Sequence, residues 1–331
     1  MKRSIFIFSS GELHRKENTL YFESEKEERK YVPVENTQEM FIFGEVTINK
    51  KLLDFLAQKE IILHFYNYYG YYTGSFYPRE HYNSGFMILR QAEAYLNQNK
   101  RVSLAKRFVE GAILNMLKVL TYYNNRGKDL SSEIEGMENL KNKIQEFNST
   151  EELMAIEGNC REYYYKGFDK IIDDQDFLFS LRTRQPPENR LNALISFGNS
   201  LLYTVVLSEI YKTHLDPRIG FLHTANFRRF SLNLDIAEIF KPIIVDRIIF
   251  TLLNKKMITK KDFLEDLGGI YLKENGQKVF IEQFDERLRT TLSDKGLGRA
   301  ISYRSLIRRE LYKLEKDLIG DKEYKPFVAR W

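Results

Sequence analysis

The sequence is poor in cysteine and contains no long apolar run. Cys160 is the single cysteine among 331 residues, which excludes a disulfide scaffold and a multi-cysteine zinc or iron–sulfur site and favours a reducing compartment. After Lys2 and Arg3 the apolar run covers only residues 5–8, shorter than the roughly seven residues of a signal-peptide core. No run approaches the 18 or so apolar residues of a membrane span. We therefore expect a soluble, cytoplasmic protein with no membrane partner.

Several common catalytic motifs are also absent. The sequence has no glycine-rich phosphate loop ending in Gly-Lys-Ser or Gly-Lys-Thr, no Gly-x-Ser-x-Gly elbow and no helix with paired zinc-binding histidines. Cys160 has no neighbouring histidine in sequence, so we expect a small buried residue rather than a nucleophile.

Positive charge is concentrated near the C-terminus. The net charge is +5, and residues 287–331 carry 12 Lys or Arg against six Asp or Glu. A localised basic surface attracts phosphate groups by steering and counterion release. A solvated helix face explains the same charge equally well, so charge alone does not identify a nucleic-acid-binding protein.

The hydrophobic period divides the chain into a β part and a helical part. We predict an α+β fold, in which an N-terminal antiparallel β domain (residues 1–80) precedes a larger, mostly α-helical domain (residues 86–331). Turn-forming residues at 77–85 predict the joint. Runs of β-branched and aromatic residues predict strands at 4–8, 19–23, 31–34, 40–43, 61–66 and 71–76. Helical spacing predicts helices over 86–120, 132–146, 150–172, 189–212, 233–255, 259–267 and 301–318.

The tyrosine-rich stretch at residues 66–72 has two explanations. Stacked aromatic side chains on a sheet can bind the bases of RNA or single-stranded DNA. Packing between strands and in the core accounts for most such tyrosines, and we prefer that explanation.

A first candidate for chemistry is Glu157. Ser149 followed by Glu152 is a capping-box signature, so we expect a helix to start near Thr150 and to carry Glu157 in its second turn. The alternative is an ordinary surface ion pair between Glu157 and Arg161, one helical turn apart.

A second candidate group lies in residues 220–242. Asp235 and Glu238 are three residues apart on a predicted helix, so both carboxylates share one face and repel each other unless a cation compensates. His223 precedes them in a loop that starts with a glycine. A histidine with carboxylates can bind Mg²⁺ or Mn²⁺. A hydrogen-bonded loop histidine without a metal is the alternative.

With these motifs in place, the chain resembles the CRISPR-associated protein 1 family, the integrase and endonuclease of CRISPR adaptation, and looks closest to members from subtype I-B systems. The resemblance is collinear over nearly the whole chain. It rests on residues 10–16, 43–46, 70–76, 157–158 with 161 and 163–164, 186–187, 192–194, 220–241, 246, 324–327 and 330–331.

The resemblance implies a metal-dependent active site. In the family, a glutamate, a histidine and a carboxylate bind a divalent metal, Mg²⁺ or Mn²⁺; the matching positions are Glu157, His223 and Glu238, with Asp235 as a neighbouring catalytic acid. Many relatives carry aspartate at the position of Glu238. Asp235 could alternatively orient His223 or a metal-bound water. Candidates for phosphate contacts with DNA are Arg161, Arg184, Arg228, Arg229, Lys241 and Arg304, any of which could simply form a surface ion pair.

The resemblance also implies an activity and partners. We expect a metal-dependent DNA endonuclease and integrase that inserts spacers into the CRISPR array by transesterification of 3′-hydroxyl ends. The DNA could be double-stranded, branched or single-stranded. Implied partners are a second copy, giving a homodimer through the β domains, and CRISPR-associated protein 2. The alternative function is a non-catalytic nucleic-acid-binding assembly protein.

Overall fold

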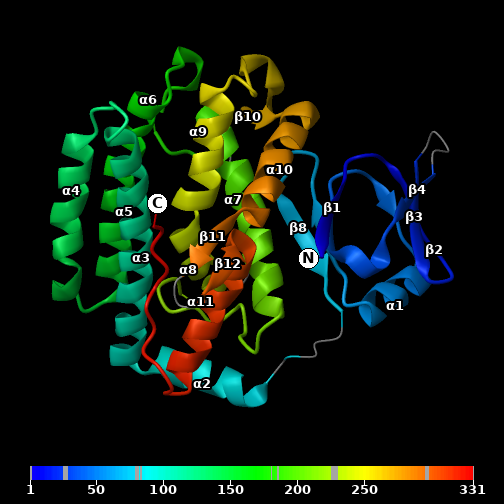
Figure 1. Ribbon diagram of the computed structural model, residues 1–331, viewed down its shortest axis with the longest axis horizontal. Helices are drawn as coiled ribbons and strands as arrows, with labels where there is room; N and C mark the ends of the chain where they lie inside the picture. Colours follow the sequence, from blue (N-terminus) through cyan, green and yellow to red (C-terminus); the bar gives the residue numbers. More distant parts are fainter. Residues whose placement is uncertain are drawn as a thin grey trace. The chain divides into compact units, whose positions relative to one another are not determined.

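In the computed structural model, the chain divides into two compact units, Met1–His81 and Tyr82–Trp331 (Figure 1). The structure describes residues 2–24, 29–78, 82, 84–179, 181–184, 186–224, 230–294 and 298–330. Residues 79–81 and 83 of the predicted joint therefore lie outside the described part of the chain. Strands precede a mostly helical region, which confirms the α+β prediction.

The described residues of the first unit form two four-stranded sheets and one helix. One sheet has the order β1-β5-β7-β8, and the other has the order β4-β3-β2-β6. The strands are β1 (Arg3–Ile7), β2 (Gly11–Lys16), β3 (Thr19–Ser24), β4 (Arg29–Val32), β5 (Thr37–Ile42), β6 (Val46–Thr47), β7 (Ile62–Tyr66) and β8 (Tyr72–Phe76). A short 3₁₀ turn, η1 (Val34–Asn36), precedes β5. Helix α1 (Lys50–Gln58) lies between β6 and β7 in sequence.

The strand pairing corrects the expectation of a purely antiparallel domain. β2, β3 and β4 pair antiparallel, as do β7 and β8. In contrast, β1 pairs parallel with β5, β5 with β7, and β2 with β6. Parallel neighbours need long crossover connections. Here strands β2–β4 connect β1 to β5, and helix α1 lies in the connection from β5 to β7, which makes both crossovers possible.

Helix α1 and both sheets share one apolar core. Asn49 starts the helix by accepting a hydrogen bond from the Leu52 amide at 3.0 Å. Buried side chains from α1, the first sheet and the second sheet pack together, represented by Leu56, Leu63 and Leu20. The sequence did not predict helix α1 or the strands β2 and β6. Within the tyrosine-rich stretch, Tyr66 is buried and stacks on Phe43 with ring centroids 4.5 Å apart, as core packing requires.

The second unit is built mainly from helices. Its helices are α2 (Gly85–Leu96), α3 (Gln98–Asn124), α4 (Ser131–Asn142), α5 (Thr150–Lys166), α6 (Phe168–Ile171), α7 (Arg190–Tyr211), α8 (Ser231–Phe240), α9 (Arg247–Asn254), α10 (Glu274–Arg289) and α11 (Tyr303–Leu318). Short helical turns are η2 (Ile144–Glu146), η3 (Gln175–Phe177), η5 (Lys260–Asp262) and the π-helical segment η4 (Pro242–Asp246). Two hairpins, β9 (Phe263–Asp266) with β10 (Gly269–Leu272) and β11 (Thr291–Asp294) with β12 (Arg299–Ser302), complete it.

The helix predicted over 259–267 is wrong. The segment forms a 3₁₀ turn and then strand β9, which pairs antiparallel with β10. Leu267 and Gly268 both have positive φ, at 47° and 73°, which is the backbone of a tight hairpin turn. This turn favours the hairpin over a continuous helix. Helix α10 and both hairpins were not predicted.

Helix α7 forms the interior of the helical unit. It contacts α8, α11, β10 and η4, and most of its residues are buried. By length and composition it could cross a membrane, but 89% of its most apolar 18-residue window is buried inside the protein. That environment is typical of a core helix.

Candidate active site

Helices α5 and α8 each contribute a carboxylate to the candidate site. Helix α5 begins at Thr150 with the predicted capping box, in which the Ser149 hydroxyl and the Glu152 carboxylate each accept a backbone N–H. This start places Glu157 in the second turn. Asp235 and Glu238 lie on α8, as the spacing predicted.

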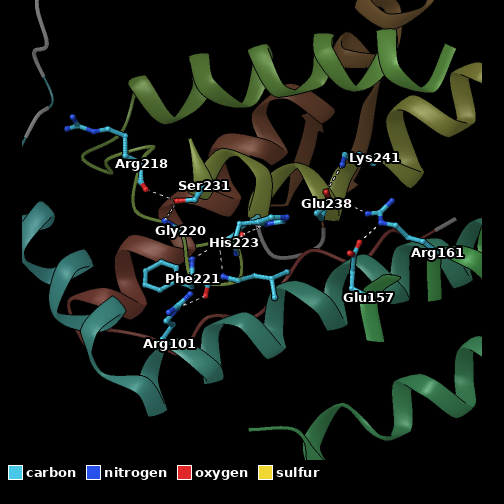
Figure 2. Close-up of polar contacts among 12 residues, drawn as sticks. Arg101, Glu157, Arg161, Arg218, Gly220, Phe221, His223, Ser231, Glu238 and Lys241 are labelled. Atoms are coloured by element: carbon cyan, nitrogen blue, oxygen red, sulfur yellow. Dashed lines mark hydrogen bonds and ion pairs between the residues drawn. The ribbon is translucent and has the colours of Figure 1, made fainter. Parts of the chain in front are cut away.

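Arg161 joins the two helices by binding both carboxylates. Its Nε donates to Glu157 and its Nη2 donates to Glu238, although Arg161 and Glu238 are 77 residues apart in sequence (Figure 2). Lys241 binds the other carboxylate oxygen of Glu238, with Nζ 2.5 Å from Oε1. The side chains of Glu157 and Arg161 are 14% exposed and that of Glu238 is 9% exposed. The pairing is therefore a nearly buried network and not the isolated surface ion pair that we considered as the alternative for Glu157.

The charges around Glu157 favour its ionised form. Burial acts to raise the pKa of Glu157, but the positive charges of Arg161 and Lys241 outweigh burial and hold that pKa below its ordinary value. His223 adds a smaller effect in the same direction, which means that its ring lies within electrostatic range of Glu157. Glu157, Arg161 and His223 thus belong to one electrostatic environment.

Asp235 orients His223 and organises the loop that carries it. Asp235 is fully buried, and its Oδ1 accepts hydrogen bonds from the His223 backbone N at 3.0 Å and ring Nδ1 at 2.8 Å. Its Oδ2 accepts the amides of Phe221 at 2.6 Å and Leu222 at 3.1 Å. With Nδ1 engaged in this way, Nε2 is the ring nitrogen left for a ligand. Asp235 therefore acts as a positioning residue.

The same loop is fixed by its glycine and by helix α3. Arg101 donates from Nε to the Phe221 carbonyl at 3.0 Å. The Gly220 amide donates to the Ser231 hydroxyl at 2.9 Å. A Cβ at Gly220 would lie 2.7 Å from an Asp235 carboxylate oxygen, so only glycine permits this close approach.

Arg161 lies between two of the three predicted metal ligands, Glu157 and Glu238. Among the described residues, no three His, Cys, Asp or Glu side chains are close enough together to hold one metal ion. Glu157 and Glu238 are brought together through the guanidinium, and His223 is held nearby by Asp235. The assignment of Glu157, His223 and Glu238 as metal ligands stays a prediction.

The predicted phosphate-binding residues have different environments. Lys241 is buried at the site, and Arg184 is exposed. The structure corrects the expectation that Arg304 contacts a DNA phosphate. Arg304 is buried on α11, and its Nε donates to Glu209 at 2.7 Å, so an internal ion pair occupies its guanidinium. Arg228 and Arg229 lie outside the described residues.

Two neighbours of the site were not predicted. The Tyr203 ring lies 4.7 Å from Lys241 Nζ; burial acts to raise the pKa of Tyr203, but Lys241 outweighs burial and lowers it. Asp246, in η4, accepts the Tyr164 hydroxyl at 3.0 Å, and burial raises its pKa to about 6. Tyr203 lies on a helix whose spacing indicates only a core element. Position 246 is among the residues that carry the family resemblance, and this resemblance is the signal in the sequence that could have identified Asp246.

Comparisons with known proteins identify the family. The model for CRISPR associated protein Cas1 matches residues 5–286. A CRISPR-associated endonuclease Cas1 2 from Thermodesulfovibrio yellowstonii is 60% identical over 331 residues, which is 100% of each chain. The solved structure of a CAS1 protein from Thermotoga maritima is 49% identical and superposes with a TM-score of 0.88, covering 99% of this chain and 100% of that one.

More distant solved structures share the fold. A casposase bound to integration product has a TM-score of 0.89 at 20% identity, covering 99% of this chain and 93% of that one. A Cas6-RT-Cas1–Cas2 complex has a TM-score of 0.85 at 17% identity, covering 100% of this chain and 36% of that one. The family match and the full-length relatives show that this chain belongs to the CRISPR associated protein Cas1 family, the endonuclease family of CRISPR adaptation.

Proposed function

We propose that this protein is a metal-dependent DNA endonuclease and integrase that inserts short DNA into a CRISPR array by transesterification. The observation that carries the proposal is the convergence of Glu157 and Glu238, from two helices, on Arg161. The orientation of His223 by Asp235 beside this pair supports it.

The donor types at the site suit a divalent cation. Two carboxylates supply the negative charge, and the arrangement of His223, with Nδ1 held by a carboxylate, is the usual arrangement of a metal-binding histidine. Oxygen ligands with one imidazole suit Mn²⁺ or Mg²⁺. Bound there, such a cation would offset the negative charge that develops on a reacting phosphate. We propose Glu157, His223 and Glu238 as its ligands.

The cationic side chains of the site have a role of their own. Arg161 now balances both carboxylates, and it would have to release at least one of them to a metal. A guanidinium released in this way is free to donate to a phosphate, next to Lys241. In the proposed reaction the oxygen of a DNA 3′-hydroxyl loses its proton to solvent and forms a new bond to phosphorus. The bond from phosphorus to the leaving 3′-oxygen breaks, and that oxygen takes a proton from solvent. Arg161 and Lys241 would hold the phosphate during this exchange.

We further propose DNA, a second copy of the chain and CRISPR-associated protein 2 as partners, in the cytoplasm. The casposase, which is bound to integration product, shares this fold and supports DNA as a partner. The Cas6-RT-Cas1–Cas2 complex shares the fold as well and supports CRISPR-associated protein 2 as a partner. The single buried cysteine suits a reducing compartment.

Strand transfer and cleavage of branched DNA with Mn²⁺ or Mg²⁺ test the proposal. We expect Glu157→Gln and His223→Ala to lower both rates at least about 100-fold, because each removes a proposed ligand of the cation that would stabilise the reacting phosphate. Glu162→Gln is the matched control, since Glu162 is exposed on the same helix. Thermal melting should show that the variants remain folded.

The same experiment separates the enzyme from its alternative. A non-catalytic assembly protein would bind DNA without metal and show no strand transfer in any variant. Undiminished activity in Glu157→Gln and His223→Ala would refute the site assignment.

A further inference from the structure

A second group of cationic side chains lies where α3 ends and α9 begins. The guanidinium of Arg126 lies 4.3 Å from the centre of the Tyr122 ring, and that of Arg247 lies 4.1 Å from the same ring. Arg247 is also 5.6 Å from the ring of Tyr123. Arg126 is exposed, while Tyr122 and Arg247 are half-buried, so this group reaches the surface.

Helix α10 adds a third guanidinium to the group. Arg287 lies 4.4 Å from the Tyr303 ring, and its Nη2 donates to the Tyr303 hydroxyl at 3.0 Å and to the Ile243 carbonyl at 2.8 Å. Arg126, Arg247 and Arg287 all act electrostatically on Tyr123. We call these residues the arginine–tyrosine cluster: Tyr122, Tyr123, Arg126, Arg247, Arg287 and Tyr303.

Burial and mutual repulsion destabilise the positive charges of the cluster. Burial lowers the pKa of Arg287, and repulsion from Arg247 lowers it further. In the described part of the chain, the Arg126 guanidinium contacts the Tyr122 ring, and the Arg287 guanidinium contacts the Tyr303 ring and the Ile243 carbonyl. These contacts to rings and a backbone carbonyl leave other N–H groups of the two guanidiniums able to donate to an anion. An anionic ligand would relieve the repulsion.

We infer that the arginine–tyrosine cluster binds the phosphodiester backbone of DNA a few nucleotides from the reacting phosphate. This inference rests on the proposed function. Planar guanidiniums are well suited to phosphate, and such contacts position DNA without reading its sequence.

The chain between the two sites sets their separation. Glu238 and Arg247 are joined by the continuous helical segments α8, η4 and α9. Nine residues at 1.5 Å each give a separation of at most about 14 Å along the axis. At about 3.4 Å of rise per nucleotide, this corresponds to roughly four nucleotides of one strand. Along the helix axis, one DNA strand is therefore long enough to span the distance between the two sites.

Metal-free DNA binding tests the inference. Fluorescence anisotropy with a branched DNA in EDTA, over a range of salt concentrations, measures affinity and its salt dependence. We expect Arg126→Ala to weaken binding at least about fivefold near 0.1 M salt and to reduce the salt slope by about 0.9, the value for one lost phosphate contact. Arg126→Lys, which keeps the charge, should recover most of the affinity.

Arg107→Ala is the matched control. Arg107 lies on the same helix α3, its loss changes the net charge equally, and its guanidinium is already paired with Glu110 at 3.3 Å and Glu323 at 2.6 Å. We expect this variant to bind DNA like the unchanged protein. An unchanged affinity and slope in Arg126→Ala, or an equal loss in Arg107→Ala, would overturn the inference. The inference would also be overturned if Arg126→Ala bound an RNA of the same sequence more weakly but bound the DNA with unchanged affinity.

The two proposals fail in distinguishable ways. If the unchanged protein shows no strand transfer with Mn²⁺ while Arg126→Ala still weakens metal-free binding, the proposed function is wrong and the DNA-binding cluster stands. If strand transfer occurs but Arg126→Ala binds DNA normally, only the cluster assignment is wrong. Melting curves confirm that the exposed substitution leaves the fold intact.

Discussion

Glu209 connects helices α7 and α11 in the interior of the helical unit, and its replacement should destabilise the protein strongly. Its carboxylate is fully buried and accepts Arg304 Nε at 2.7 Å and Arg308 Nε at 2.6 Å. Lys212 Nζ lies 3.1 Å away. Removing this one negative charge leaves three cations next to each other, two of them largely buried.

The size of the effect follows from the pKa. Burial acts to raise the pKa of Glu209, but Lys212, Arg304 and Arg308 outweigh burial and lower it from 4.5 to about 2. At 1.36 kcal/mol per pKa unit, the ionised carboxylate contributes about 3 kcal/mol at neutral pH. Because the folded pKa is the lower one, this contribution is complete well above pH 4.5 and is lost as the pH falls toward 2. We expect roughly half of this contribution to remain at pH 3.

Urea unfolding followed by far-UV circular dichroism measures this contribution. Glu209→Gln should lower the free energy of unfolding by about 3 kcal/mol or more at pH 7, and the deficit should shrink toward pH 3. A double-mutant cycle with Arg304→Met measures the coupling between the two residues. The losses of unfolding free energy in the two single variants should together exceed the loss in the double variant by at least about 1 kcal/mol. A deficit below about 1 kcal/mol at pH 7, or one independent of pH, would refute the reasoning.

Two further predictions concern the candidate site. Asp235→Asn should lower the strand-transfer rate and the Mn²⁺ affinity about 10- to 100-fold, because His223 loses the carboxylate that holds Nδ1; unchanged metal titrations would contradict this. Cys160 should react with iodoacetamide at pH 8 at least about 100-fold more slowly than free cysteine until urea unfolds the protein, because burial and nearby Glu157 raise its pKa to about 12. Rapid labelling of the folded protein would contradict the second.

Local features of the sequence were sufficient for much of the helical unit. The capping box at Ser149 located the start of α5, and the spacing of Asp235 and Glu238 placed both on α8. The interpretation of Cys160 as a small buried residue is also confirmed. These features succeed because a cap or a helical period depends on residues within one or two turns of each other.

Features that depend on distant partners were missed or misjudged. The β domain is mixed because strands far apart in sequence pair in parallel, and alternation along one strand does not reveal its neighbour's direction. The positive charge of Arg304 indicated a contact with DNA phosphate. Its actual partner, Glu209, lies 95 residues away in sequence, so local spacing could not reveal the ion pair.

The sequence by itself determined the order of strands and helices in outline, the helices that carry Glu157, Asp235 and Glu238, and, by resemblance, the family. Only the tertiary structure decided that Arg161 holds the carboxylates of α5 and α8 together, and that Asp235 orients His223. The physical reason is that periodicity assigns a side chain to a face of its own helix, while packing between helices decides which charge that face meets.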